Sequence, residues 1–160
     1  MKTPLNSSLE VGVRVLVLLL EAFPIPLDVN RLVLLDHGLL HSADLGGPES
    51  LHPPLPIRAG ELGMKRRTIE EGLQLMIRAE LVEMRSTEGG INYQASDKAY
   101  EFVSILTSAY AKSLHVRATW VIAHFENLNE ASLREGMRVI ADNWSEEFES
   151  LNYSITSDGT

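Results

Sequence analysis

The basic run Lys65-Arg66-Arg67 is the strongest candidate for binding chemistry in this sequence of 160 residues. Lysine and arginine side chains pair with phosphate oxygens, and the start of a helix adds backbone N–H donors. Residues 58–85 hold six basic and five acidic residues and form the only net-basic segment, whereas the whole chain carries −8. The run therefore predicts a nucleic-acid contact that the overall charge opposes, and a solvated surface or a protein–protein contact is the alternative.

Two histidines, His37 and His41, are four residues apart on one predicted helix, a spacing at which both rings can bind one metal ion. A hydrolytic zinc site normally has a glutamate between the two histidines, but residues 38–40 are Gly-Leu-Leu. The chain has no cysteine, which excludes thiolate nucleophiles, Cys-bearing zinc sites and disulfides. It also has no Gly-x-Ser-x-Gly elbow and no phosphate-binding P-loop. These features predict a protein that is not an enzyme and that has neither a cofactor nor a metal site.

The first predicted helix, residues 9–20, is apolar on almost its whole circumference. Leu9, Val13, Leu16 and Leu20 recur at helical spacing, and further valines and leucines fill the other faces. Such a helix is buried on most sides, either by its own domain or by a partner. We predict that these four residues contact a partner protein.

Two other segments supply predicted partner contacts. Leu51 and Leu55 are apolar residues of a long loop, residues 42–57, that proline keeps stiff. Trp144 and Phe148 lie on the apolar stripe of a last helix predicted over residues 130–151.

The middle of the chain follows the order of a winged helix-turn-helix core. Asp28 caps a first helix, the run at 66–68 forms a tight break between two more, and a Gly-Gly turn joins two short strands. The predicted helices are 29–41, 59–65 and 68–79, and the predicted strands are 81–85 and 91–95. Further helices at 97–106 and 108–125 follow. The fold class is therefore mainly α, with a β-hairpin wing and additional N- and C-terminal helices.

This pattern divides the chain into four parts. They are an N-terminal helix with a Pro-rich turn (1–27), the winged core (28–95), the C-terminal helices (96–151) and a tail (152–160). The most apolar early run contains Arg14 and is too short to span a bilayer. We expect a cytoplasmic protein without membrane contact.

An ordered set of short motifs resembles the middle component of bacterial ABC-three-component systems. The motifs are densest before residue 62 and occupy residues 4–12, 23–24, 27–28, 31–36, 41–42, 46–48, 50–53, 58–62, 72–76 and 81–83.

The resemblance implies a small, non-catalytic winged-helix adaptor subunit. Its partners would be an SMC-like ATPase with a long coiled coil and an effector, often a nuclease, in an antiviral or anti-plasmid defence complex of the Lamassu type. DNA would be bound indirectly, through the complex. The alternative from another class is a stand-alone winged-helix transcriptional regulator that binds DNA through Arg66 and Arg67.

Overall fold

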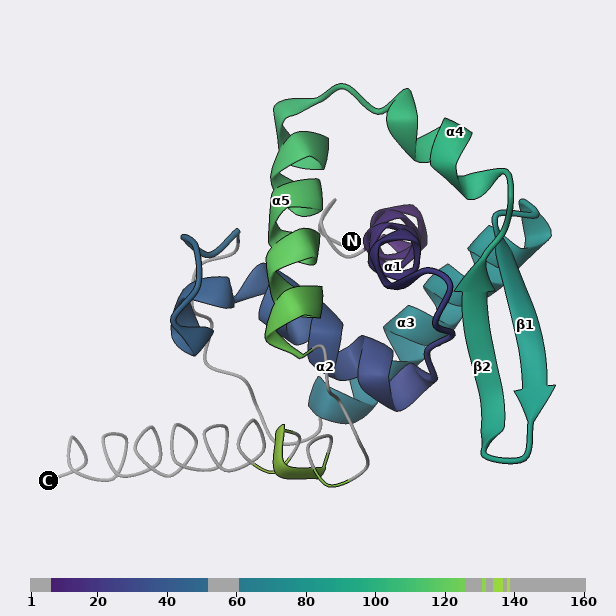
Figure 1. Ribbon diagram of the computed structural model, residues 1–160, viewed down its shortest axis with the longest axis horizontal. Coiled ribbons are helices and arrows are strands. Elements are labelled where there is room, and N and C mark those ends of the chain that lie inside the picture. The colour runs from purple at the N-terminus through teal and green to yellow at the C-terminus, as the bar shows by residue number, and fades with distance from the viewer. Residues whose placement is uncertain (1–6, 52–60, 126–130, 132–133, 137, 139–160) are drawn as a thin grey trace, which may run out of the picture.

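A computed structural model of the chain describes residues 7–51 and 61–125, together with residues 131, 134–136 and 138. This part is mainly helical and contains one two-stranded antiparallel sheet (Figure 1). The elements are α1 (Ser8–Ala22), α2 (Val29–Leu40), the 3₁₀ helix η2 (Ser42–Leu45), α3 (Glu61–Arg78), β1 (Val82–Thr87), β2 (Gly90–Ala95), α4 (Ala99–Ser104) and α5 (Ala109–His124).

Helix α1 lies in the middle of the fold, and α5, α4, α3 and the hairpin surround it in the end-on view of Figure 1. Ser7 caps this helix, because its hydroxyl accepts a hydrogen bond from the Glu10 N–H at 3.2 Å. The helix ends before Phe23-Pro24, where the predicted Pro-rich turn begins. The chain's own domain buries most of the apolar circumference of α1, but Leu9 in the first turn stays 57% exposed.

Helices α1 and α3 touch through two glycines. A Cβ atom on Gly72 would lie only 2.9 Å from the backbone nitrogen of Gly12, and a Cβ on Gly12 would lie 3.2 Å from the carbonyl oxygen of Gly72. Any larger residue at the crossing would force the two backbones apart. The leucines and valines around this contact form the core, together with Ile69, Leu73 and Met76 of α3.

The predicted break at residues 66–68 is wrong, because α3 is one continuous helix from Glu61 to Arg78. The Thr68 hydroxyl donates a hydrogen bond to the Met64 carbonyl at 2.8 Å, four residues back, instead of capping a new helix. Arginine is a good helix former, so nothing in the run Arg66-Arg67 ends the helix. The segments predicted as helices 59–65 and 68–79 are thus one element.

The hairpin is confirmed, with β1 and β2 paired from Val82 opposite Ala95 to Thr87 opposite Gly90. The segment between α1 and α2 adds a third backbone contact, in which Leu27 and Tyr93 each donate an N–H to the other's carbonyl, at 2.9 and 2.8 Å. Strand β2 therefore lies between this segment and β1, which is the outer strand in Figure 1.

The remaining helices follow their predicted order. Asp28 caps α2 through the Arg31 N–H, and Ser108 caps α5 through the Ala111 N–H. Helix α4 is shorter than predicted, with six residues. The last predicted helix, 130–151, falls almost entirely outside the described residues.

Candidate functional site

Three charged side chains from three helices meet inside the fold. Arg14 of α1 donates to Asp36 of α2 through Nε–Oδ1 at 2.9 Å and Nη2–Oδ2 at 3.3 Å. Lys65 of α3 lies with its Nζ 3.1 Å from Asp36 Oδ2. Arg14 and Asp36 are 3% and 1% exposed, whereas Lys65 is 19% exposed. We call these three residues the ion cluster; it joins α1, α2 and α3 and holds one positive charge in excess.

The ion cluster keeps Asp36 ionised. Burial alone would raise the pKa of Asp36, but the nearby charges of Arg14 and Lys65 outweigh burial and hold this pKa well below its ordinary value. Burial alone would lower the pKa of Arg14. The neighbouring Asp36 carboxylate outweighs burial, so the pKa of Arg14 is raised above its ordinary value. A buried charge is strongly destabilising without its partner, so the cluster ties the positions of the three helices together.

Tyr110 of α5 brings a fourth polar group to this region. Its hydroxyl is buried and makes no hydrogen bond of ordinary geometry with the described part of the chain, although it lies within the electrostatic reach of Arg14. Burial raises the pKa of Tyr110, with Glu10 adding to the effect and Arg14 opposing it. The phenol therefore stays neutral at physiological pH.

The histidine pair lies beside the ion cluster. The rings of His37 and His41 are 4.9 Å apart. Burial lowers the pKa of His37 to about 3, and the positive charge of Lys65 acts in the same direction. Across residues 7–51 and 61–125, no group of three or more His, Asp or Glu side chains is placed to hold a metal ion.

The structure separates the basic run Lys65-Arg66-Arg67 into three environments. Lys65 points inward to Asp36, and Arg66 donates to Glu70 at 3.3 Å and to Asn30 of α2. Arg67 is exposed and forms no ion pair with a described residue. Lys65 and Arg66 already face acidic side chains. Among these three residues, Arg67 alone therefore keeps a charge that could pair with a phosphate.

The residues predicted to contact a partner protein differ in how far their side chains are buried. Leu16 is fully buried in the core, so the structure offers no support for a partner contact by its side chain. Val13, Leu20 and Leu51 are partly buried against that core, and Leu9 is 57% exposed. Leu55, Trp144 and Phe148 lie outside the described residues.

The loop after α2 packs on the chain itself as far as the structure describes it. The indole of Trp120 lies against Gly47, where a Cβ atom would come within 2.5 Å of the ring. Arg117 donates to the Glu49 carbonyl at 2.8 Å, and the Leu51 N–H donates to the Leu40 carbonyl at 3.1 Å. This half of the loop is therefore part of the α2–α5 packing.

Several large apolar side chains that were not predicted as contacts are more than half exposed. They lie at the α1–α2 connection, on the hairpin and on α3, α4 and α5: Phe23, Ile25, Met64, Met84, Ile91, Tyr100, Ile105 and Val116.

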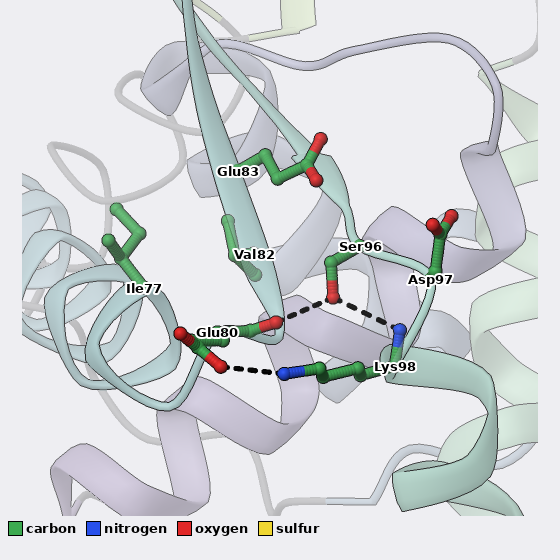
Figure 2. Close-up of a pocket in the computed structure, with 7 residues that line it drawn as sticks. All are labelled: Ile77, Glu80, Val82, Glu83, Ser96, Asp97 and Lys98. Atoms are coloured by element: carbon green, nitrogen blue, oxygen red, sulfur yellow. Dashed lines mark hydrogen bonds and ion pairs between the residues drawn. The ribbon is translucent and has the colours of Figure 1, made fainter.

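A shallow hollow lies where α3, the hairpin and the segment before α4 meet (Figure 2). Glu80 has a positive φ of 62° at the end of α3, and its carboxylate pairs with Lys98 at 2.6 Å. The Ser96 hydroxyl donates to the Glu80 carbonyl at 2.7 Å. These contacts fix the exit of α3, and the acidic groups around the hollow are exposed.

Sequence reasoning saw Lys65 as a DNA contact and missed Arg14 and Asp36. The signal was present, because each of the latter two interrupts a run of apolar residues on a helix. A charge on the buried side of a helix needs a partner of opposite sign. Two such positions with opposite charges on neighbouring helices predict an ion pair.

The fold and this site define a small helical domain with a β-hairpin, held together by a buried ion cluster. Over residues 4–147 the chain matches the family ABC-three component (ABC-3C) system Middle Component 2, and it belongs to this family. Searches of curated proteins and of solved structures returned no match. No described helix has the length and apolar character that a membrane crossing requires.

Proposed function

We propose that this chain is a non-catalytic adaptor subunit that links an SMC-like coiled-coil ATPase to an effector, often a nuclease, in a cytoplasmic defence complex of the Lamassu type. The observation that carries the proposal is the family match over residues 4–147, since a middle component is by name one part of a multi-component system. The particular partners come from the resemblance and are part of the proposal.

The adaptor domain is a winged helix in this proposal, with α1, α2 and α3 as its three helices. Two observations support this topology. The hairpin follows α3 directly, and Leu27 pairs with Tyr93 at the position where a short strand joins the wing of such folds. This assignment places α1, instead of α2, first among the three helices.

Exposed apolar side chains supply surfaces with which an adaptor could bind two proteins. Tyr100 and Ile105, at α4, are 73% and 72% exposed, and Phe23 and Ile25, in the connection between α1 and α2, are 53% and 64% exposed. The two groups lie on different segments, as an adaptor with two partners requires. Large apolar side chains of this kind dominate protein–protein contacts.

The alternative, a stand-alone DNA-binding regulator, is less well supported. Lys65 is engaged with Asp36, and Arg66 is engaged with Glu70, so the run offers little charge for phosphates. A net charge of −8 also repels the DNA backbone.

The test is affinity purification of the tagged chain coexpressed with the proposed ATPase and effector. Replacing Tyr100 and Ile105 by Ser should reduce recovery of one partner, and replacing Phe23 and Ile25 by Ser should reduce recovery of the other. The exposed change Thr119→Ala on α5 serves as the matched control and should retain both. Failure of the unmodified chain to bind either protein would reject the adaptor function.

A further inference from the structure

The outer edge of β1 carries backbone groups that no described residue satisfies. Tyr93 of β2 exchanges both of its backbone hydrogen bonds with Leu27, so it cannot bond Met84, which lies opposite it on β1. In an antiparallel ladder, bonded and non-bonded pairs alternate. The N–H and C=O of Met84 therefore point away from β2, toward the free edge that Figure 1 shows on the outside of the hairpin.

Two of the features that usually prevent strand pairing are missing from this edge, although β1 is short and carries Glu83 and Arg85. Strand β1 contains no proline, and its register with β2 runs without a bulge from Val82 to Thr87. All of its side chains after Val82 are exposed. An edge of this kind is a template for a further strand.

We propose that the free edge of β1 binds the same edge of a second copy of this chain, in an antiparallel register centred on Met84. This pairing would join two hairpins into a four-stranded sheet. It is independent of the adaptor function, because it needs no other protein.

Charge complementarity selects both the occupant and the register. Glu83 and Arg85 lie on one face of β1, each 55% exposed, and pair with each other at 3.6 Å. In the register centred on Met84, Glu83 of each copy lies opposite Arg85 of the other, which forms two cross-strand ion pairs. Shifting the centre by one residue in either direction would instead place Glu83 opposite Glu83 or Arg85 opposite Arg85, and like charges would repel.

The apolar face of the hairpin supports the same register. Met84 shares a face with Tyr93 and Ile91, and Met84 and Ile91 extend beyond the part of this face that packs on the core. The two Met84 side chains become direct neighbours across the new pair. Each copy thereby covers exposed apolar surface of the other.

A single-cysteine cross-link tests the register, since the chain has no other cysteine. Met84→Cys would place the two Cα atoms about 5.5 Å apart, within disulfide range. Thr87→Cys is the matched control on the same exposed strand, because the two Cα atoms would lie about 20 Å apart. We expect rapid disulfide formation by the first variant only. Equal rates for both variants would overturn the proposal.

Charge reversal tests the interface in solution by sedimentation of the full chain over a series of concentrations. Glu83→Arg and Arg85→Glu should each weaken dimerisation about tenfold, because both symmetric ion pairs become repulsive. The double variant should restore it, since the two charges then exchange places and each again faces one of opposite sign. A chain that stays monomeric at every concentration, or a dimer that the single reversals do not weaken, would overturn the proposal. Occupation of this edge by a strand of another protein would appear as the first of these two results.

Discussion

Removing the negative charge of Asp36 should destabilise the fold far more than removing an exposed charge. Asp36→Asn keeps the size of the side chain but leaves Arg14 and Lys65 facing each other without an anion. Lys65, at 19% exposure, can turn toward water, whereas Arg14, at 3%, cannot. Breaking a buried pair in this way costs about 3–5 kcal/mol, a large part of the roughly 5–15 kcal/mol that a domain of this kind has in total.

Denaturant unfolding followed by far-UV circular dichroism measures this cost. The double variant Arg14→Met with Asp36→Leu removes both buried charges and should return to within about 2 kcal/mol of the unmodified chain. Glu80→Gln is the control: its ion pair with Lys98 is shorter, at 2.6 Å, but is exposed to solvent, so we expect little change in stability. An Asp36→Asn variant within about 1 kcal/mol of the unmodified chain would refute this account of the ion cluster.

Three further predictions concern pH, packing and charge. His37 has a pKa of about 3 in the fold and an ordinary value of 6.5, so between these pH values the unfolded chain binds a proton that the fold excludes. The free energy of unfolding should therefore fall as pH drops from 6.5 toward 3, by up to about 1.4 kcal/mol per pH unit. His37→Asn should flatten this slope, as measured by urea unfolding. Gly72→Ala should cost about 1–3 kcal/mol in the same assay, while Gly89→Ala, whose Cβ would have its nearest neighbour at 3.9 Å, should cost under about 0.5 kcal/mol. Replacing Arg66 and Arg67 by Ala should leave partner recovery unchanged, and the unmodified isolated chain should show almost no duplex DNA binding at physiological salt.

Each of these expectations has a clear contrary result. A His37→Asn variant with the same pH slope would show that another group excludes the proton. Equal stabilities of the two glycine variants would mean that α1 and α3 do not touch as described. Submicromolar DNA binding by the isolated chain, abolished by the double arginine change, would favour the regulator over the adaptor. Lys65 is excluded from that test because its loss also disturbs the ion cluster.

Local chemistry predicted those features whose causes lie within a few residues. Asp28 caps α2 as predicted, through the N–H three residues on, and this contact needs no other part of the chain. The hairpin likewise follows from its Gly-Gly turn and its flanking strands.

The failures have a different origin. Thr68 has the residue type and spacing of a cap, but a threonine hydroxyl can equally bond the carbonyl four residues back, and the packing of α3 against α1 selects the continuous helix. The ion cluster joins Arg14 to Asp36 across 22 residues, and its third member comes from yet another helix. Periodicity within one helix does not show which charges meet, so Lys65 was assigned to a surface that it does not face.

Reconstitution of the complex with and without this chain tests the adaptor function most directly. The tagged effector and the coiled-coil ATPase would be coexpressed, purified through the effector and analysed by size-exclusion chromatography with light scattering. We expect the ATPase to co-elute with the effector only when this chain is present, and all three proteins to share one peak. Equal recovery of the ATPase without this chain, or a peak that excludes this chain, would contradict the adaptor function.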